Sequence, residues 1–516
     1  MSLDQVARPD SFQAPRLKQV ALVMPLALLL LWTAAVRLPF YAATNGDEYF
    51  FSVIADQWLH GGLPYVATFD IKPPGLFLIF AVVQEFFGAS YATFKGMEIV
   101  AVALGAGALY APLKTLATRR LAIWVAILYP VYTLAFEGAA AVNMLLQLPL
   151  IILSFGAVMS AVRDVATASD RLRYAFLAGL AIGAAGMIKQ TAVFEAAAVF
   201  LAICLFGERG MRIRMLALFV AGAAVPAAVF STYFLAVGHF GEMFQAVVVL
   251  ALQRIDDSVA SAYGPDMARY LTFPGAMENA LLRSATVIFL WGGALFAVLR
   301  LARIRRAVPA RMLAISGLWL GAGFLSAAAG RLLCDYYLLT IVPPLLIVAG
   351  AFYCYGLDVR PQRAGRAFLA SVFAGIAMLG YAEHRTLFDF AKYQAEHDLV
   401  SRTADAIRDL GLAPADKLLV LNRGLALHVE TGARPPSKYF HGTHLLSPFR
   451  TPSADPLAEA LATNPRFIVL ADPSLRLLAE TPARYRQALD YLAQHYRAAT
   501  VVKGTLDTYV VYEFRG

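Results

Sequence analysis

The sequence predicts a polytopic α-helical membrane protein that carries a small α/β domain at its C-terminus. Of its 516 residues, 59% are hydrophobic and only 15% are charged, whereas a soluble domain carries about 25% charged residues. The basic residues behind the net charge of +9 fall in short clusters between apolar segments, as the loops of a membrane protein require. This placement argues against nucleic acid as a partner and makes membrane lipids the expected surroundings.

The apolar segments supply eleven candidate membrane spans. No small-residue cleavage site follows the first segment, so we expect a retained helix and not a signal peptide. The three cysteines lie in or beside apolar segments without metal-binding spacing, and we expect them to be buried. The predicted spans are 20–38, 93–113, 120–136, 142–162, 173–188, 190–206, 213–236, 284–301, 312–329, 334–355 and 366–383.

A further apolar segment, 73–88, is shorter than the about 20 residues that a perpendicular span needs. If this segment does not cross and the N-terminus is cytoplasmic, the lysines and arginines concentrate in the cytoplasmic segments. If it crossed, every later basic cluster would change sides. We therefore predict a short interfacial helix with Pro73 and Pro74 in its first turn.

This topology divides the chain into a transmembrane domain, 1–383, and an outer-face domain, 384–516. The transmembrane domain then has two long outer loops, 39–92 and 237–283. In the tail, helical patterns alternate with β-rich runs, which predicts a small α/β domain. The helical patterns lie near 393–411, 455–463 and 482–496, and the β-rich runs at 417–422, 466–472, 499–504 and 507–514.

The first outer loop contains two groups suited to chemistry. Asp47 and Glu48 follow the first span, where charges are costly unless they are used or well solvated. An acidic pair at a helix start can equally serve as a cap, so the pair alone is weak evidence for catalysis. Lys72 precedes two prolines at the expected interface, where it could hold a lipid phosphate or simply extend to the membrane surface.

The stretch GDEYFFSVIADQWLHGGLPYVATFDIKPPG, 46–75, joins the acids, a short helix, a Gly-Gly turn and the lysine in one loop. It resembles the first outer loop of the polyprenyl-phosphate-sugar-dependent glycosyltransferases of the GT-C superfamily, whose bacterial members carry a DE…Y…A…G…PY…D…KPP pattern. These enzymes include the protein O-mannosyltransferases and the lipid A aminoarabinose transferase. Three later stretches resemble further family segments: MIKQTAVF (187–194), GRLLCDYYLLTIVPPLLI (330–347) and DKLLVLNRGLALHVETGARPP (416–436).

The resemblance covers almost the whole chain and implies the GT-C fold. It also implies transfer of a sugar, with inversion, from a polyprenyl-monophosphate donor to a hydroxyl of lipid A, an envelope glycan, another lipid or a protein. Asp47, the first acid of the motif, is then the expected general base, with Glu48 orienting the acceptor or a loop cation. Fixed cations would stabilise the leaving phosphate, and the candidates are Lys72, Arg331 and Lys189.

Two departures from the family pattern affect the expected sugar or acceptor site. The acid that the family often has early in the fourth span is here Asn143, which can hydrogen-bond but cannot act as a base. The histidine before the family's tyrosine pair is here Asp335. Lys189 could instead form a buried ion pair with Glu195 or Glu137, and the tyrosines could anchor the interface. The candidates for this site are Asn143, Glu137, Asp335, Tyr336 and Tyr337.

The resemblance also implies a prokaryotic inner membrane, with a cytoplasmic N-terminus and a periplasmic C-terminal domain. We expect no required cofactor. A divalent metal is not indicated, because His428, His441 and His444 are widely spaced and unaccompanied by cysteine. Two alternatives remain: a transporter of lipid-linked sugars, which should carry ionisable residues at mid-membrane in repeat-related helices, and a non-catalytic subunit that binds polyprenyl phosphate.

Overall fold

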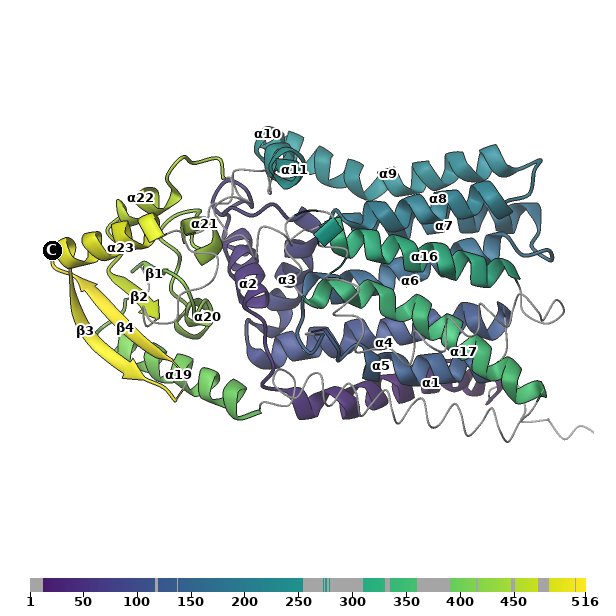
Figure 1. Ribbon diagram of the computed structural model, residues 1–516, viewed down its shortest axis with the longest axis horizontal. Coiled ribbons are helices and arrows are strands. Elements are labelled where there is room, and N and C mark those ends of the chain that lie inside the picture. The colour runs from purple at the N-terminus through teal and green to yellow at the C-terminus, as the bar shows by residue number, and fades with distance from the viewer. Residues whose placement is uncertain are drawn as a thin grey trace, which may run out of the picture.

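A bundle of long helices forms one end of the protein and a smaller α/β domain forms the other, with α2 (Gly46–Leu59) and α3 (Pro74–Phe87) between them (Figure 1). The structure is a computed structural model. It describes residues 13–116, 119–136, 138–253, 310–329, 335–359, 390–413, 416–446, 451–471, 482–505 and 507–516, with 272, 274, 275 and 278.

The bundle helices coincide with all predicted spans except 284–301 and 366–383, which lie outside the described residues. Short helical segments accompany them: η1 (Leu38–Phe40), α10 (Phe240–Phe244), η2 (Gln245–Leu250), α11 (Ala251–Gln253) and η4 (Asp335–Ile341). The bundle helices are α1 (Gln13–Arg37), α4 (Tyr91–Leu116), α5 (Arg119–Tyr132), α6 (Asn143–Ala161), α7 (Ala168–Gly186), α8 (Ala192–Phe206), α9 (Arg212–Ala236), α16 (Ala310–Ala329) and α17 (Val342–Val359).

The bundle has the surface of an integral membrane protein. Within the described residues, four helical segments are long and apolar enough to cross a membrane: Tyr91–Tyr110, Asn143–Ala161, Arg212–Ala236 and Arg311–Ala329. Large apolar side chains such as Leu31 of α1 and Ile213 of α9 are exposed, because lipid and not the protein core covers them. Helices suit this setting since each satisfies its own backbone hydrogen bonds.

Small residues let α7 and α9 approach closely. A Cβ atom added at Gly183 of α7 would lie 2.3 Å from the Ala223 carbonyl oxygen, and one added at Gly222 of α9 would lie 2.3 Å from the Phe176 carbonyl oxygen. Glycine is therefore required at both positions, as at many helix crossings in membranes. This packing forms one wall of the cavity described below.

The helix predicted at 73–88 is α3. Pro73 occupies its N-cap position and Pro74 its first helical position, where a missing N–H costs no helical hydrogen bond. Its 14 residues span about 21 Å, less than the about 30 Å of a hydrocarbon core. The interfacial placement of this helix remains a prediction.

The C-terminal domain is built on a four-stranded sheet of order β1-β2-β4-β3. Strands β1 and β2 are parallel, and the other two pairings are antiparallel. The boundary predicted at 383/384 lies outside the described residues. The elements are α19 (Phe390–Asp409), β1 (Leu418–Val420), α20 (Ala426–Thr431), α21 (Gly442–Leu446), α22 (Pro456–Leu461), β2 (Phe467–Ala471), α23 (Pro482–His495), β3 (Tyr496–Lys503) and β4 (Thr508–Phe514).

Aromatic contacts join the C-terminal domain to the 39–92 loop. The Phe50 ring of α2 lies 5.1 Å from the Phe440 ring and 4.5 Å from the His441 ring, centroid to centroid. The Phe69 N–H also donates a 2.9 Å hydrogen bond to the Lys438 carbonyl. The loop is therefore held between the bundle and the C-terminal domain.

Candidate active site

The first turn of α2 carries the predicted general base. Asn45 caps the helix by accepting a 2.9 Å hydrogen bond from the Asp47 N–H, so Asp47 itself is not the cap. The half-buried Asp47 carboxylate accepts a 2.7 Å hydrogen bond at Oδ2 from the hydroxyl of Tyr336 in η4. The structure thus brings the first acid of the motif together with the tyrosine pair, 289 positions away in the chain.

Lys189 lies against the same tyrosine pair. Its ammonium nitrogen is 3.3 Å from the Tyr337 ring centroid and 5.6 Å from that of Tyr336, a cation–π arrangement. Both tyrosines are buried, and their contacts join Asp47 to Lys189. The predicted alternative partner, Glu195, accepts a 2.7 Å hydrogen bond from the Thr340 hydroxyl.

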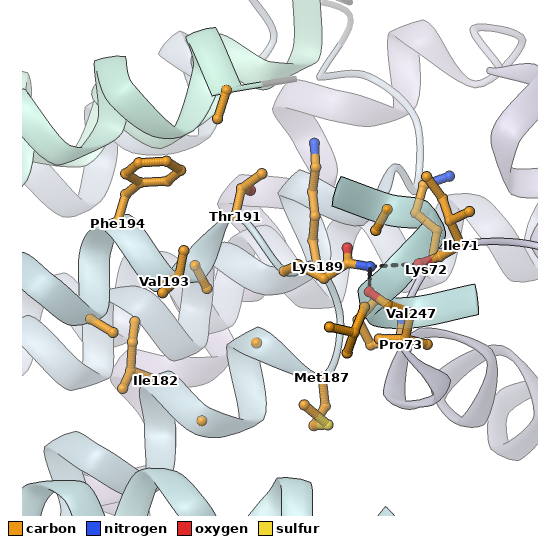
Figure 2. Close-up of a pocket in the computed structure, with 18 of the residues that line it drawn as sticks. Ile71, Lys72, Pro73, Ile182, Met187, Lys189, Thr191, Val193, Phe194 and Val247 are labelled. Atoms are coloured by element: carbon orange, nitrogen blue, oxygen red, sulfur yellow. Dashed lines mark hydrogen bonds between the residues drawn. The ribbon is translucent and has the colours of Figure 1, made fainter. Parts of the chain in front are cut away.

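A cavity of about 670 Å³ opens beside Lys189 and Lys72 (Figure 2). Both lysines line it, together with Tyr337. The other walls are largely apolar and come from α7, α8, α9, η2, α11 and the end of α16, with residues such as Ile182, Phe194, Ala223, Val247 and Leu252. The cavity therefore combines two cations with an extended apolar surface.

Three contacts position Lys72. Its ammonium nitrogen lies 3.4 Å from the Asp70 carboxylate and 5.2 Å from the Phe51 ring centroid. The Tyr65 hydroxyl donates a 2.7 Å hydrogen bond to the Lys72 carbonyl. Asp70 is not among the residues predicted from the sequence, although its position two residues before Lys72 is compatible with an ion pair.

Gln190 links the Lys72 segment to the opposite wall of the cavity. Its side-chain NH₂ donates hydrogen bonds to the Ile71 carbonyl at 2.5 Å and to the Val247 carbonyl of η2 at 3.0 Å (Figure 2). One amide therefore connects the 39–92 loop, the turn before α8 and η2. Gln190 is not among the residues predicted from the sequence, where its only signal is its place beside Lys189.

Glu48 binds two backbone N–H groups, and its predicted role toward the acceptor or a loop cation remains a prediction. Its side chain is 2% exposed. Oε1 accepts a 3.1 Å hydrogen bond from the Asn45 N–H, which completes a capping box, and Oε2 accepts one of 2.8 Å from the Ala141 N–H. Burial raises the Glu48 pKa to about 7, although both N–H groups and Lys95 act in the opposite direction.

This raised pKa predicts a pH-dependent stability difference between wild type and Glu48→Gln. Below pH 4.5 the carboxyl is protonated in both folded and unfolded chains, whereas between pH 4.5 and 7 only the unfolded chain ionises. The wild type should therefore lose about 3 kcal/mol relative to Glu48→Gln as pH rises through this window. Thermal unfolding at both ends of the window measures this, with exposed Glu85→Gln as control. The prediction is wrong if the stability difference between wild type and Glu48→Gln does not change with pH.

Asn143 and Gln147 are fully buried one turn apart on α6. Neither side-chain amide has a hydrogen-bond partner among the described residues. Each buried, unpaired polar group costs about 1–3 kcal/mol, so both amides are suited to a hydroxyl-bearing ligand or water. Asn143 is among the residues predicted from the sequence and Gln147 is not, although Gln147 lies four residues after Asn143 on the same predicted span.

The remaining predicted site residues are only partly described. Arg331 and Glu137 lie outside the described residues, and Asp335 is described only as the first residue of η4.

In the described part of the chain, no three histidine, cysteine or acidic side chains gather as a metal site. The buried His428 ring contacts the Ala433 carbonyl through Nδ1, and burial lowers its pKa to about 4.

Comparison with known proteins identifies the fold. The sequence matches no protein-family model and no curated protein. Among solved structures, the chain is similar to ArnT from Cupriavidus metallidurans bound to undecaprenyl phosphate, with a TM-score of 0.64 and 13% identity over 95% of this chain and 98% of that one. The apo state of ArnT gives a TM-score of 0.63 and 14% identity over 96% and 98% of the two chains.

A second similar structure is the archaeal oligosaccharyltransferase AglB from Archaeoglobus fulgidus, in complex with an inhibitory peptide and a dolichol-phosphate. Its TM-score is 0.51, with 12% identity over 88% of this chain and 69% of that one. At such low identity the likeness establishes the fold. The GT-C fold implied by the sequence motifs is therefore confirmed.

Proposed function

We propose that this integral membrane protein of GT-C fold is a glycosyltransferase that moves a sugar from a polyprenyl monophosphate to a hydroxyl acceptor. One observation carries the proposal: Lys72, Lys189 and Tyr337 line a largely apolar cavity, and the neighbouring Tyr336 donates a hydrogen bond to the Asp47 carboxylate. Asp47 reaches Lys189 through Tyr336, and Lys189 shares the cavity with Lys72. The lipid phosphates bound to ArnT and AglB support this class of donor.

The cavity suits the two unlike parts of such a donor. The phosphate would bind at Lys72 and Lys189, where ammonium groups form strong charge-assisted hydrogen bonds. The first isoprene units would lie along the apolar wall from α7, α8, α9 and η2, which removes their surface from water. Its volume of about 670 Å³ lies within the about 300–1,000 Å³ of small-molecule sites. Arg331 remains a third candidate for the phosphate.

The chemistry requires one base and stabilised negative charge. The acceptor oxygen attacks the anomeric carbon and transfers its proton to Asp47, while the anomeric C–O bond breaks and its electron pair remains on the phosphate. Lys72 and Lys189 stabilise that growing charge. The Tyr336 hydrogen bond fixes the orientation of the Asp47 carboxylate. Direct displacement by the acceptor inverts the anomeric configuration.

Asn143 and Gln147 would hold sugar or acceptor hydroxyls, since each amide both donates and accepts hydrogen bonds. The Ala141 N–H, two residues before Asn143, binds Glu48, so the start of α6 lies next to the first turn of α2. Glu137, Asp335 and the tyrosine pair remain candidates for the same contacts. Acceptors in keeping with the proposal are lipid A, an envelope glycan, another lipid or a protein on the periplasmic face of a bacterial inner membrane.

Replacing Gln147 by methionine should separate stability from function. Removing the unpaired amide should stabilise the ligand-free protein by about 1–3 kcal/mol, because methionine fills similar space without a polar group. Sugar transfer should fall, since a hydroxyl partner is lost. Thermal unfolding without ligand and product formation measure the two effects. A less stable variant with unchanged transfer would show that the amide serves the fold and not the substrate.

The proposed function is tested by profiling envelope glycans by mass in cells that carry the wild type, Asp47→Asn or no copy of the gene. We expect one sugar to disappear from one acceptor both without the gene and in Asp47→Asn, and the missing mass identifies both. If deletion removes a glycan and Asp47→Asn retains it, Asp47 is not the base and the chain is a carrier or accessory subunit. If no glycan changes, the proposal is wrong.

A further inference from the structure

Three buried ionic side chains join the ends of α1 and α4 to the turn between α5 and α6. Arg37 and Glu98 are fully buried and Lys95 nearly so. Glu98 forms ion pairs with both Arg37 and Lys95. None of the three was singled out as a functional candidate from the sequence. Charges in such surroundings persist only where they are paired and hydrogen-bonded.

The two cations also bind carbonyl groups around the α5–α6 turn. Arg37 donates to the Pro130 carbonyl at 2.8 Å and to the Gly138 carbonyl. Lys95 donates to the Ala139 carbonyl at 2.6 Å. The chain turns between α5 and α6, so carbonyl groups there lack partners within a helix. The Arg37 and Lys95 hydrogen bonds supply these partners, as buried irregular backbone in a membrane protein requires.

The turn between α5 and α6 has few other backbone conformations open to it. Phe136 has a φ of +59°, a left-handed conformation that is unfavourable for a side chain of this size. A Cβ atom at Gly138 would lie 1.8 Å from the Thr133 carbonyl oxygen, so only glycine fits. Strained backbone of this kind persists where its surroundings impose it, and here the Arg37 and Lys95 bonds do so.

The same turn presents the Ala141 N–H to Glu48. Glu48 completes the capping box of α2, whose first turn carries Asp47. A continuous set of contacts therefore runs from Glu98 through the two cations, the turn and Glu48 to the proposed base. Glu98 is the carboxylate that pairs with both cations, so its loss leaves uncompensated positive charge in this buried set.

We infer that Arg37, Lys95 and Glu98 are positioning residues for Asp47, acting through the 138–141 turn and Glu48. This inference rests on the proposed function and assigns Glu48 to the same positioning role. None of these side chains needs to touch the substrate. They hold Asp47 in the position that catalysis requires. A displacement of the base by about 1 Å can lower the rate about 10²-fold.

Hydrogen exchange and cellular glycan profiling of the full-length protein test this inference together. In nanodiscs, Glu98→Gln should increase amide exchange in both 138–143 and 44–50, because loosening the turn releases the α2 cap. In cells, the glycan product per folded chain should fall about 10- to 100-fold. Affinity for undecaprenyl phosphate should stay unchanged, because Lys72 and Lys189 lie outside the network.

Lys95→Met is a milder variant that retains the Arg37–Glu98 ion pair, and it serves if Glu98→Gln fails to fold. The double variant Lys95→Met/Glu98→Gln should lose less activity than the product of the two single losses, because removing Lys95 lowers the positive charge that Glu98→Gln leaves uncompensated. Arg171→Met is the matched control. Arg171 is also buried and bonds a carbonyl and a glutamate, Ala161 at 3.1 Å and Glu208 at 3.0 Å, but it lies outside the network.

The inference is overturned if folded Lys95→Met and Glu98→Gln retain wild-type product levels, or if exchange rises in 138–143 without rising in 44–50. It is also overturned if Arg171→Met gives the same changes as the network variants. Failure of the proposed function appears differently, as an unchanged glycan profile in Asp47→Asn, and leaves the exchange result intact.

Discussion

Asp47→Asn is expected to lower the rate of sugar transfer by about 10²–10⁴-fold, the usual contribution of a general base. Asparagine keeps the shape of aspartate and an oxygen that can accept the Tyr336 hydrogen bond, but it cannot take a proton from the acceptor. Binding of undecaprenyl phosphate should be unchanged, because the lysines that would hold the phosphate remain. Product formation and lipid-phosphate binding, measured on the same purified protein, separate the two effects.

Asp56→Asn is the matched control for this variant. Asp56 lies on the same helix, α2, and its exposed carboxylate pairs with the exposed His60 at 3.4 Å. Its replacement should leave transfer unchanged. Tyr336→Phe should give a smaller loss than Asp47→Asn, since the base remains but loses a hydrogen bond that orients it. Wild-type transfer by Asp47→Asn would require a different base.

Lys72→Met and Lys189→Met are each expected to weaken binding of undecaprenyl phosphate by about 10- to 150-fold. A hydrogen bond to a charged group contributes about 1.5–3 kcal/mol, and every 1.4 kcal/mol is about tenfold in Kd. Transfer should fall further than binding, because charge on the phosphate increases in the transition state. Titration of each variant with undecaprenyl phosphate measures the binding effect.

Undecaprenol, which has the same tail without the phosphate, distinguishes the two halves of the proposed donor site. Its binding should be insensitive to Lys72→Met and Lys189→Met, since the apolar wall of the cavity is unchanged. Lys417→Met, on an exposed lysine of the C-terminal domain, controls for loss of one positive charge. Equal weakening of both ligands by the lysine variants would show that these residues shape the cavity and do not bind phosphate.

The sequence by itself determined the helical membrane character, the helix at 73–88 and most of the residues proposed here to act. These features are local. An apolar segment of sufficient length forms a membrane-spanning helix because the helix satisfies its own backbone hydrogen bonds in lipid. The two prolines favour the start of a helix. The motif from Asp47 to Lys72 could be recognised for the same reason, because both residues lie in one continuous loop.

Only the tertiary structure decided which side chains contact one another and which bind backbone groups. Tyr336 reaches Asp47 across 289 positions, and Glu48 reaches Ala141 across 93. The sequence could not show that Glu48 binds two backbone N–H groups. Nor could it show that Arg37, Lys95 and Glu98 share one buried network. Such contacts depend on how helices cross and how turns bend, which hydrophobic periodicity along a single segment does not encode.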